Sequence, residues 1–298
     1  MGSEHVQTEA AGAFEGLDTW DDARILDALI TGQERAIAAV RAVLPRIAEA
    51  AAVVAERIAN GGCLIYAGAG TSIRIAVQDG SELPATFGMP EDKIAYLIAG
   101  GRNAMFDTLA EAEDDAVDGA AQAEIFQPGD VMVAVAASGS TPFTIAAARR
   151  AREKGAFVIA VVNNPGSALA AISDIEILLA SGAEVIAGST RMGAGTAQKA
   201  ALNLLSTLTH IRLGAVHDGL MVNVQTGNAK LKRRAAAIVA KIANVDEARA
   251  MDALNAAGGH VKPAVLICAG AENHDAAQRL LRDAKGNLRL ALARLAAP

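Results

Sequence analysis

A short run of glycines and hydroxylated residues stands where a buried strand is expected to end. This run is GAGTS at 68–72, and it follows the apolar stretch 63–67. Glycines at such a break let the backbone turn tightly and approach a ligand. The free N–H groups of a helix that starts there favour an anion. We therefore interpret Gly70, Thr71 and Ser72 as part of a phosphate-binding turn.

A second copy of this arrangement follows the apolar run 131–136. Pro142 suits the first turn of a helix, where its missing N–H would be unpaired in any case. A single Ser or Thr at such a place is usually an ordinary helix cap. Five hydroxyls over two strand ends exceed what capping needs, which favours a phosphorylated small molecule as ligand. The residues expected to bind it from the second loop are Ser138, Gly139, Ser140 and Thr141.

A dinucleotide-binding loop is the main alternative to a simple phosphate-binding turn. Its fingerprint requires a third glycine, three residues beyond Gly70, for close packing of helix and strand. Position 73 is an isoleucine, so the pattern fails where it is most demanding.

A third stretch, 182–199, is again small and rich in glycine but carries charge. Here Arg191 and Lys199 are candidates to meet a substrate anion, although each could equally form a surface ion pair worth little. Two carboxylates outside this stretch, Glu82 and Glu113, also stand out. The run 111–115 around Glu113 is, on spacing alone, typical of a solvated face. The remaining candidate binding residues in the third stretch are Glu184 and Ser189.

Composition narrows the class of protein. Of 298 residues 52% are hydrophobic but 3% aromatic, which favours helices packed on aliphatic strands. The formal net charge of −6 argues against a nucleic-acid or membrane partner. No apolar run reaches the roughly 18 residues of a membrane span, and no leader pattern is seen at the N-terminus, so a cytoplasmic protein is expected. Cys63 and Cys268 are interpreted as free buried thiols, and the scattered histidines indicate neither a metal site nor a cofactor.

Short apolar runs alternate with helical patterns through the middle of the chain. This alternation predicts an α/β fold, a doubly wound parallel sheet whose ligands bind beyond the carboxyl ends of the strands. Helices are expected after Ser72, Gly101, Pro142, Gly166 and Thr190. The expected strands are Leu64–Ala67, Ile94–Ile98, Val131–Ala136, Phe157–Val162 and Ile175–Leu179.

The two ends of the chain have different patterns. Residues 1–16 are polar and small and are predicted to be a flexible arm. Residues 17–58 are predicted to be helical, with a capping box at Thr19 and Asp22 and a break at Pro45. We divide the chain into the arm, a ligand-binding sheet domain with its N-terminal helices (17–229), and a small helical C-terminal domain (230–298).

Many segments, in register, give the chain a family resemblance. It resembles the N-acetylmuramic acid 6-phosphate etherases, bacterial enzymes built on the sugar isomerase (SIS) fold. The resemblance runs from about Leu17 into the C-terminal helices. Its segments are LDT (17–19), GAGTS (68–72), SELPATFG (81–88), LIAGG (97–101), AEDD (112–115), AASGSTPF (136–143), NPGS (164–167), GSTRMGAGTAQK (188–199), LNLLST (202–207) and LMVNVQTGNAKL (220–231).

The resemblance implies a reaction, used in recycling cell-wall amino sugars. The ether between D-lactate and C3 of the sugar is cleaved by elimination and water addition, which gives N-acetylglucosamine 6-phosphate. It implies that Glu82 is the acid and Glu113 the second catalytic carboxylate. A free glutamate titrates near roughly 4.3, so the acid must have a raised pKa. The resemblance also implies a homodimer with sites near the subunit contact and no cofactor.

The chain departs from the family pattern at several positions. Ser140 replaces an arginine and Gly193 a lysine, which removes cations that could hold the phosphate or the lactate carboxylate. A divergent member, with altered substrate preference or weaker activity, is consistent with these changes. The other departures are Ile73, Leu83, Ala85, Phe143 and Asn223.

Two alternatives remain open from the sequence. An aldose–ketose phosphosugar isomerase of the same fold would also need a base at C2, and Glu184 lies where such isomerases carry theirs. A non-catalytic sugar-phosphate sensor would bind without turnover.

Overall fold

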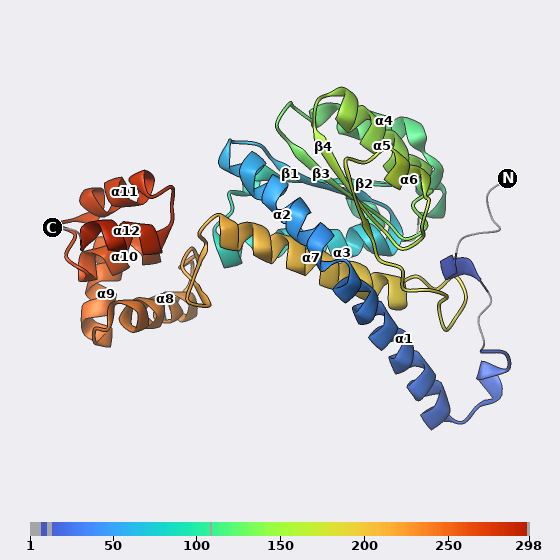
Figure 1. Cartoon of the computed structure of the whole chain (residues 1–298), viewed down its shortest axis with the longest axis horizontal. Coiled ribbons are helices and arrows are strands. Elements are labelled where there is room, and N and C mark those ends of the chain that lie inside the picture. The colour runs from blue at the N-terminus through green and yellow to red at the C-terminus, as the bar shows by residue number, and fades with distance from the viewer. Residues whose placement is uncertain (1–6, 11–13, 108, 297–298) are drawn as a thin grey trace. The chain divides into compact units, whose positions relative to one another are not determined.

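A five-stranded parallel sheet forms the centre of the computed structural model (Figure 1), which describes residues 7–10, 14–107 and 109–296. The strand order is β2-β1-β3-β4-β5. The strands are β1 (Leu64–Gly68), β2 (Ile94–Ile98), β3 (Val131–Ala136), β4 (Phe157–Val162) and β5 (Ile175–Leu178).

The predicted strands are confirmed. Three of them have the expected bounds, β1 is one residue longer and β5 one shorter. Every residue of β1 and β3 is buried. Side chains covered on both sides explain why these strands are continuous apolar runs instead of alternating polar and apolar residues.

Helices cover both faces of the sheet, as expected for a doubly wound fold (Figure 1). On one face α4 (Ala116–Gln122), α5 (Pro142–Glu153) and α6 (Ala168–Ala171) share a core with alternate strand residues. On the other face lie α2 (Leu44–Ala59), α3 (Gly70–Phe87) and α7 (Gly193–Arg212). Small alanines such as Ala147, Ala148 and Ala151 let α5 approach the strands closely.

The N-terminal helices are α1 (Asp22–Ala42) and α2, with Pro45 in the first turn of α2. The predicted capping box at Thr19 is wrong. Asp21 is the N-cap of α1, and its carboxylate accepts a hydrogen bond from the backbone N–H of Arg24 at 2.9 Å. Thr19 instead donates its hydroxyl to the carbonyl of Gly16.

The helix predicted directly after Gly101 is also wrong. The chain forms two 3₁₀ turns, Arg102–Met105 and Ala110–Asp114, before α4 begins. Two carbonyls of this segment, those of Ala104 and Asp107, accept from the Arg74 guanidinium. A side chain of another helix thus supplies donors that a continuing helix would have taken from its own backbone.

Part of the predicted flexible arm is docked on the sheet domain. Thr8 is fully buried, and its carbonyl accepts from the backbone N–H of Gly188 at 3.0 Å. The amide of Asn164 donates to the Thr8 hydroxyl at 3.0 Å. Residues 1–6 and 11–13 of the arm lie outside the described residues.

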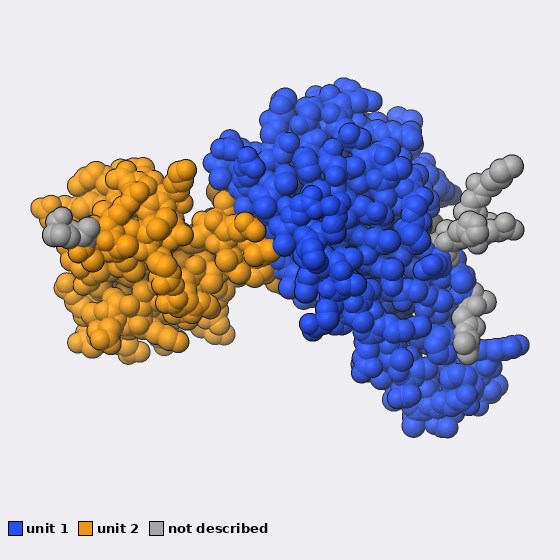
Figure 2. All heavy atoms as spheres, in the orientation of Figure 1, with its two compact units in different colours: residues 1–81, 92–206 blue, residues 82–91, 207–298 orange. Residues whose placement is uncertain are grey.

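The chain divides into two compact units, coloured separately in Figure 2. The first unit comprises residues 1–81 and 92–206, and the second comprises residues 82–91 and 207–298. Val222 and Val224, which precede residue 230, pack into the core of the C-terminal helices. None of the described helices is long and apolar enough to cross a membrane.

The second unit contains a small hairpin that the sequence did not suggest. Strands β6 (Val216–His217) and β7 (Leu220–Met221) pair antiparallel around Asp218 and Gly219, both of which have positive φ. That conformation at both turn positions matches the twist of two-residue hairpins. The helices that follow are α8 (Ala229–Ala243), α9 (Glu247–Ala256), α10 (Val261–Cys268), α11 (His274–Asp283) and α12 (Leu288–Leu295).

Candidate phosphosugar site

The two hydroxyl-bearing loops follow neighbouring strands. β1 and β3 pair in parallel, with Gly68 opposite Val135, so both strands end at the same edge of the sheet. The chain then turns into α3 at Gly70, where φ is +52°, a conformation that favours glycine. The predicted loops at 68–72 and 137–141 therefore leave the same edge of the sheet side by side.

The second loop is held in place by the segment after β4. Asn164 Nδ2 donates to the carbonyl of Ala137 at 2.8 Å, and the backbone N–H of Leu169 donates to that of Gly139 at 3.0 Å. Gly139 has a φ of +67°, and a Cβ added there would lie 2.3 Å from the Ser167 hydroxyl oxygen. The loop conformation thus requires glycine for two reasons, its backbone angle and the lack of space.

The hydroxyls of this loop do not cap the helix they precede. Thr141 is the N-cap residue of α5 but makes no side-chain capping hydrogen bond, and Pro142 follows it. Ser140 donates both its backbone N–H and its hydroxyl to Ser138 Oγ, at 3.2 and 2.9 Å. The positive end of the α5 dipole is therefore left uncapped by side chains beside three hydroxyls, an arrangement suited to a phosphate.

Glu113 belongs to the 3₁₀ turn Ala110–Asp114, and its carboxyl approaches the N-terminus of α3 beside the first loop. A Cβ placed on Gly70 would lie 2.9 Å from Glu113 Oε1. The residue as a whole is exposed, but its carboxyl is partly withdrawn from water, and this burial together with the charge of Asp114 raises its pKa. Arg74 opposes the rise. A carboxyl with a raised pKa can exchange a proton nearer neutral pH.

Sequence reasoning missed Arg74. Its Nη2 donates to the carbonyls of Ala104 and Asp107, at 2.8 and 3.0 Å, and so fixes the segment that carries Glu113. Its Nε is buried with no hydrogen-bond partner among the described residues. The available signal was its position, four residues after Gly70 in an otherwise apolar helical turn.

The third predicted stretch, 182–199, lies beside the first loop where α7 begins. A Cβ on Gly195 would lie 3.6 Å from the methyl carbon of Thr71. Glu184 is buried, and its two carboxylate oxygens accept from the backbone N–H groups of Gly193 and Ala194, at 2.9 and 2.8 Å. Glu184 thus caps α7, a structural task that already employs both of its oxygens.

The cations of that stretch differ in their surroundings. Arg191 is exposed, and Ser189 is half-buried on the same loop. Lys199, also exposed, donates to Asn203, whose amide in turn donates to the buried Asp79 at 2.6 Å. Lys199 is therefore partly engaged by a network that also includes Tyr66, whose hydroxyl donates to Asp79 at 2.7 Å.

Glu82 is exposed and lies far along α3 from Glu113. It is twelve residues beyond Gly70 on one continuous helix, which at about 1.5 Å per residue is a separation of roughly 18 Å along the axis. Glu82 therefore lies toward the C-terminal end of α3, whereas the Glu113 carboxyl lies beside its N-terminal end.

The parallel doubly wound sheet with helices on both faces is that of an SIS-domain protein, and two family models agree. Residues 46–151 match the glucokinase regulatory protein N-terminal SIS domain, and residues 108–208 match the SIS domain. Relatives named N-acetylmuramic acid 6-phosphate etherase, 40–50% identical over at least 80% of the chain, show that the chain belongs to that family.

Relatives of that name support the assignment along most of the chain. A Symbiobacterium thermophilum protein is 50% identical over 80% of this chain and 80% of its own length. A Deinococcus radiodurans relative is 43% identical over 90% of this chain and 88% of its own. One from Klebsiella aerogenes is 40% identical over 93% of both chains.

A solved structure supports the fold alone. It is from Bacteroides fragilis and is described as a candidate phosphosugar isomerase involved in capsule formation. It is 22% identical, covers 65% of this chain and 94% of its own, and superposes with a TM-score of 0.50.

The crowding at Gly139 predicts a position-specific loss of stability. Gly139→Ala and Gly166→Ala both put a side chain at positive φ, but a Cβ at 166 meets nothing within 4 Å. A positive φ costs roughly 1–2 kcal/mol in either variant. We expect Gly139→Ala to lower the free energy of unfolding further, since Ser167 must move, as measured by urea denaturation. Equal losses in the two variants would contradict the crowding argument.

The surroundings of Glu113 predict how its pKa responds to charge changes. Carbon-13 NMR of labelled glutamate, with the Glu113 signal assigned by its loss in Glu113→Gln, should give a pKa above that of a free glutamate. Asp114→Asn removes a raising charge and should lower this pKa, whereas Arg74→Met should raise it. Glu111→Gln is the matched control and should leave it unchanged. A Glu113 pKa at or below the ordinary value would refute the electrostatic picture.

Proposed function

We propose that this protein cleaves the D-lactyl ether of N-acetylmuramic acid 6-phosphate, giving N-acetylglucosamine 6-phosphate and D-lactate. The observation that carries the proposal is the meeting of three elements at one sheet edge. These are the uncapped α5 terminus with its hydroxyls, the glycine turn into α3, and the Glu113 carboxyl beside that turn. Relatives of this name, 40–50% identical over most of the chain, agree with it.

The elimination requires two proton transfers, one from C2 of the sugar and one to the lactyl oxygen that leaves C3. In the open-chain sugar the C2 proton is acidic, because the C1 aldehyde stabilises the resulting carbanion. A base takes this proton, the C3–O bond breaks, and an acid protonates the departing lactyl oxygen. Water then adds to the C2=C3 double bond, with the hydroxyl on C3 and a proton on C2. Positioned carboxyl groups typically accelerate such transfers by roughly 10²–10⁴-fold.

In this proposal the hydroxyl groups bind the substrate and the carboxyl groups transfer protons. The hydroxyls of Ser138, Ser140 and Thr141, with those of Thr71 and Ser72, hold the phosphate. Arg191, which is exposed, attracts the substrate's anionic groups. Glu113, whose raised pKa suits proton exchange, is one catalytic carboxylate. Glu82 is the other and serves as the acid.

We further propose that Glu82 reaches the site from a second copy of the chain. The roughly 18 Å that separate Gly70 and Glu82 along α3 leave the pair too far apart within one chain. An apolar stripe on α1 gives a surface for dimer formation. Its members, Leu26, Ile30 and Ile37, share one face of the helix and are 63%, 55% and 45% exposed. Figure 1 shows α1 extending away from the sheet.

The cytoplasm is the proposed location. Both cysteines, Cys63 and Cys268, are free and partly buried, which suits a reducing compartment. The reaction belongs to the recycling of cell-wall amino sugars.

The isomerase alternative is less well supported than the etherase. It would need Glu184 as a base, yet both oxygens of this buried carboxylate accept backbone hydrogen bonds. Incubation with N-acetylmuramic acid 6-phosphate and assay of D-lactate separates the alternatives. Ketose formation from a hexose phosphate would select the isomerase, and binding without turnover would select a sensor.

Replacing either catalytic carboxylate should nearly abolish lactate release. Glu82→Gln and Glu113→Gln keep the shape of the side chain but remove its proton exchange, so we expect losses of roughly 10²-fold or more in kcat. Glu111→Gln, a neighbour on the same exposed segment, is the control. Full activity in both Gln variants would end the assignment of these residues.

Mixing the two inactive variants tests the shared site. If each site takes Glu113 from one subunit and Glu82 from the other, a mixed dimer carries one doubly damaged site and one intact site. Random subunit exchange at equal amounts should then restore about a quarter of wild-type activity. No recovery after verified exchange would place both carboxylates in one subunit's site or remove one of them from catalysis.

A further inference from the structure

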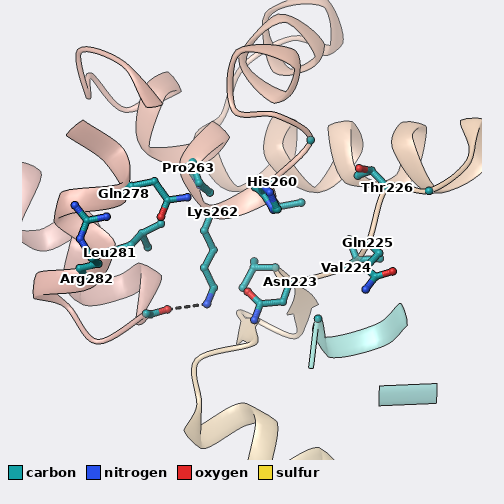
Figure 3. A pocket seen from close by; sticks show the side chains of 16 residues that line it. Asn223, Val224, Gln225, Thr226, His260, Lys262, Pro263, Gln278, Leu281 and Arg282 are labelled. Carbon is teal, nitrogen blue, oxygen red and sulfur yellow. Dashed lines mark hydrogen bonds between the residues drawn. The ribbon is translucent and has the colours of Figure 1, made fainter. Parts of the chain in front are cut away.

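The second unit contains a cavity of about 700 Å³, separate in its residues from the loops described above (Figure 3). All of its lining residues belong to residues 82–91 and 207–298. Most come from the segment between β7 and α8, the turn into α10 with its first residues, and the C-terminal half of α11, and Gly88 and Gly286 complete the lining. Its volume is in the range of small-molecule sites.

The charge of this cavity is opposite to that of the chain. The protein has 33 acidic and 27 basic residues, yet no Asp or Glu is among the described residues that line the cavity. Two side chains with a cationic group, Lys262 and Arg282, line it together with His260. A cavity that concentrates cations without a carboxylate suits an anion.

Lys262 is the unusual member of this group. The residue as a whole is 8% exposed, and its Nζ donates to the carbonyl of Gly286 at 2.7 Å. No carboxylate among the described residues forms an ion pair with it, and burial lowers its pKa to about 8. A buried ammonium is costly unless a charge or several acceptors compensate. One carbonyl leaves two of its three N–H groups available to a ligand.

The neighbours of Lys262 complete the arrangement. Figure 3 shows its side chain between Asn223 on one side and Gln278, Leu281 and Arg282 of α11 on the other. α10 begins at Val261, and its N-cap residue makes no side-chain capping hydrogen bond, so the positive end of that helix adds to the cationic field. The apolar wall consists of Val222, Val224, Val261, Pro263 and Leu281.

We propose that this cavity is a second binding site, for a small molecule whose carboxylate or phosphate group pairs with Lys262 and Arg282. The ammonium of Lys262 supplies the buried charge, and the exposed guanidinium of Arg282 closes the anion from the rim. The apolar wall takes the carbon part of the ligand. The proposal does not depend on the etherase reaction, since no residue assigned to that reaction lines the cavity.

The test reads the protonation of Lys262 in the wild-type full chain. Lysine labelled with carbon-13 at Cε is followed by NMR against pH, and the Lys262 signal is assigned by its absence in Lys262→Met, or in Lys262→Arg if the Met variant does not fold. An oxyanion beside the ammonium should raise the Lys262 midpoint by roughly one pH unit. The probes are inorganic phosphate and acetate, compared with sodium chloride at equal ionic strength.

The outcomes separate the sources and decide the proposal. A shift with phosphate indicates a phosphorylated ligand, and one with acetate a carboxylate ligand. The shift should shrink in Arg282→Gln and persist in Lys241→Met, an exposed lysine of α8. No shift with either probe, or an equal shift with chloride or in Arg282→Gln, would overturn the site. Because the signal is local to Lys262, phosphate bound at the first unit's loops does not imitate it.

Discussion

The parallel pairing of β1 with β3 is the constraint on which the candidate site depends. Gly68 lies so close to its neighbour that a Cβ there would be 2.6 Å from the carbonyl oxygen of Val135. The strand order reverses at this pair, with β2 on one side of β1 and β4 beyond β3. Helices that follow strands at such a switch point depart in different directions and leave room for a ligand between their N-termini.

The carboxyl of Glu113, one of the two proposed catalytic groups, is positioned by irregular backbone. Glu113 reaches the start of α3 because the segment after β2 forms 3₁₀ turns, and Arg74 binds two carbonyls of that segment. The same guanidinium lowers the pKa of Glu113 while partial burial and Asp114 raise it. Arg74 thus fixes the backbone of the segment that carries Glu113 and also limits the rise of the Glu113 pKa. A change at Arg74 would therefore alter both the position and the proton affinity of Glu113.

The two units use the same alanine-rich packing for different purposes. In the first unit, small side chains bring helices close to the strands, and polar groups gather at the carboxyl edge of the sheet. In the second unit, alanines and aliphatic residues from α8 to α12 form a core of helices alone. There Lys262, though buried, is held beside open space and not within a network of carboxylates.

Local signals in the sequence were sufficient for the sheet, for both hydroxyl-bearing turns and for the helical C-terminal part, since apolar runs, glycines and Pro142 act over a few residues. The family resemblance supplied the expected roles of both glutamates. The sequence could not show that Glu184 caps α7, that Thr8 is buried against Asn164, or that Arg74 binds two carbonyls of the segment after β2. These features join positions distant in the chain or depend on burial. The sequence by itself determined which hydroxyl and carboxyl side chains follow each strand. Tertiary packing decided which of these side chains are used in hydrogen bonds within the protein and which can still bind a ligand.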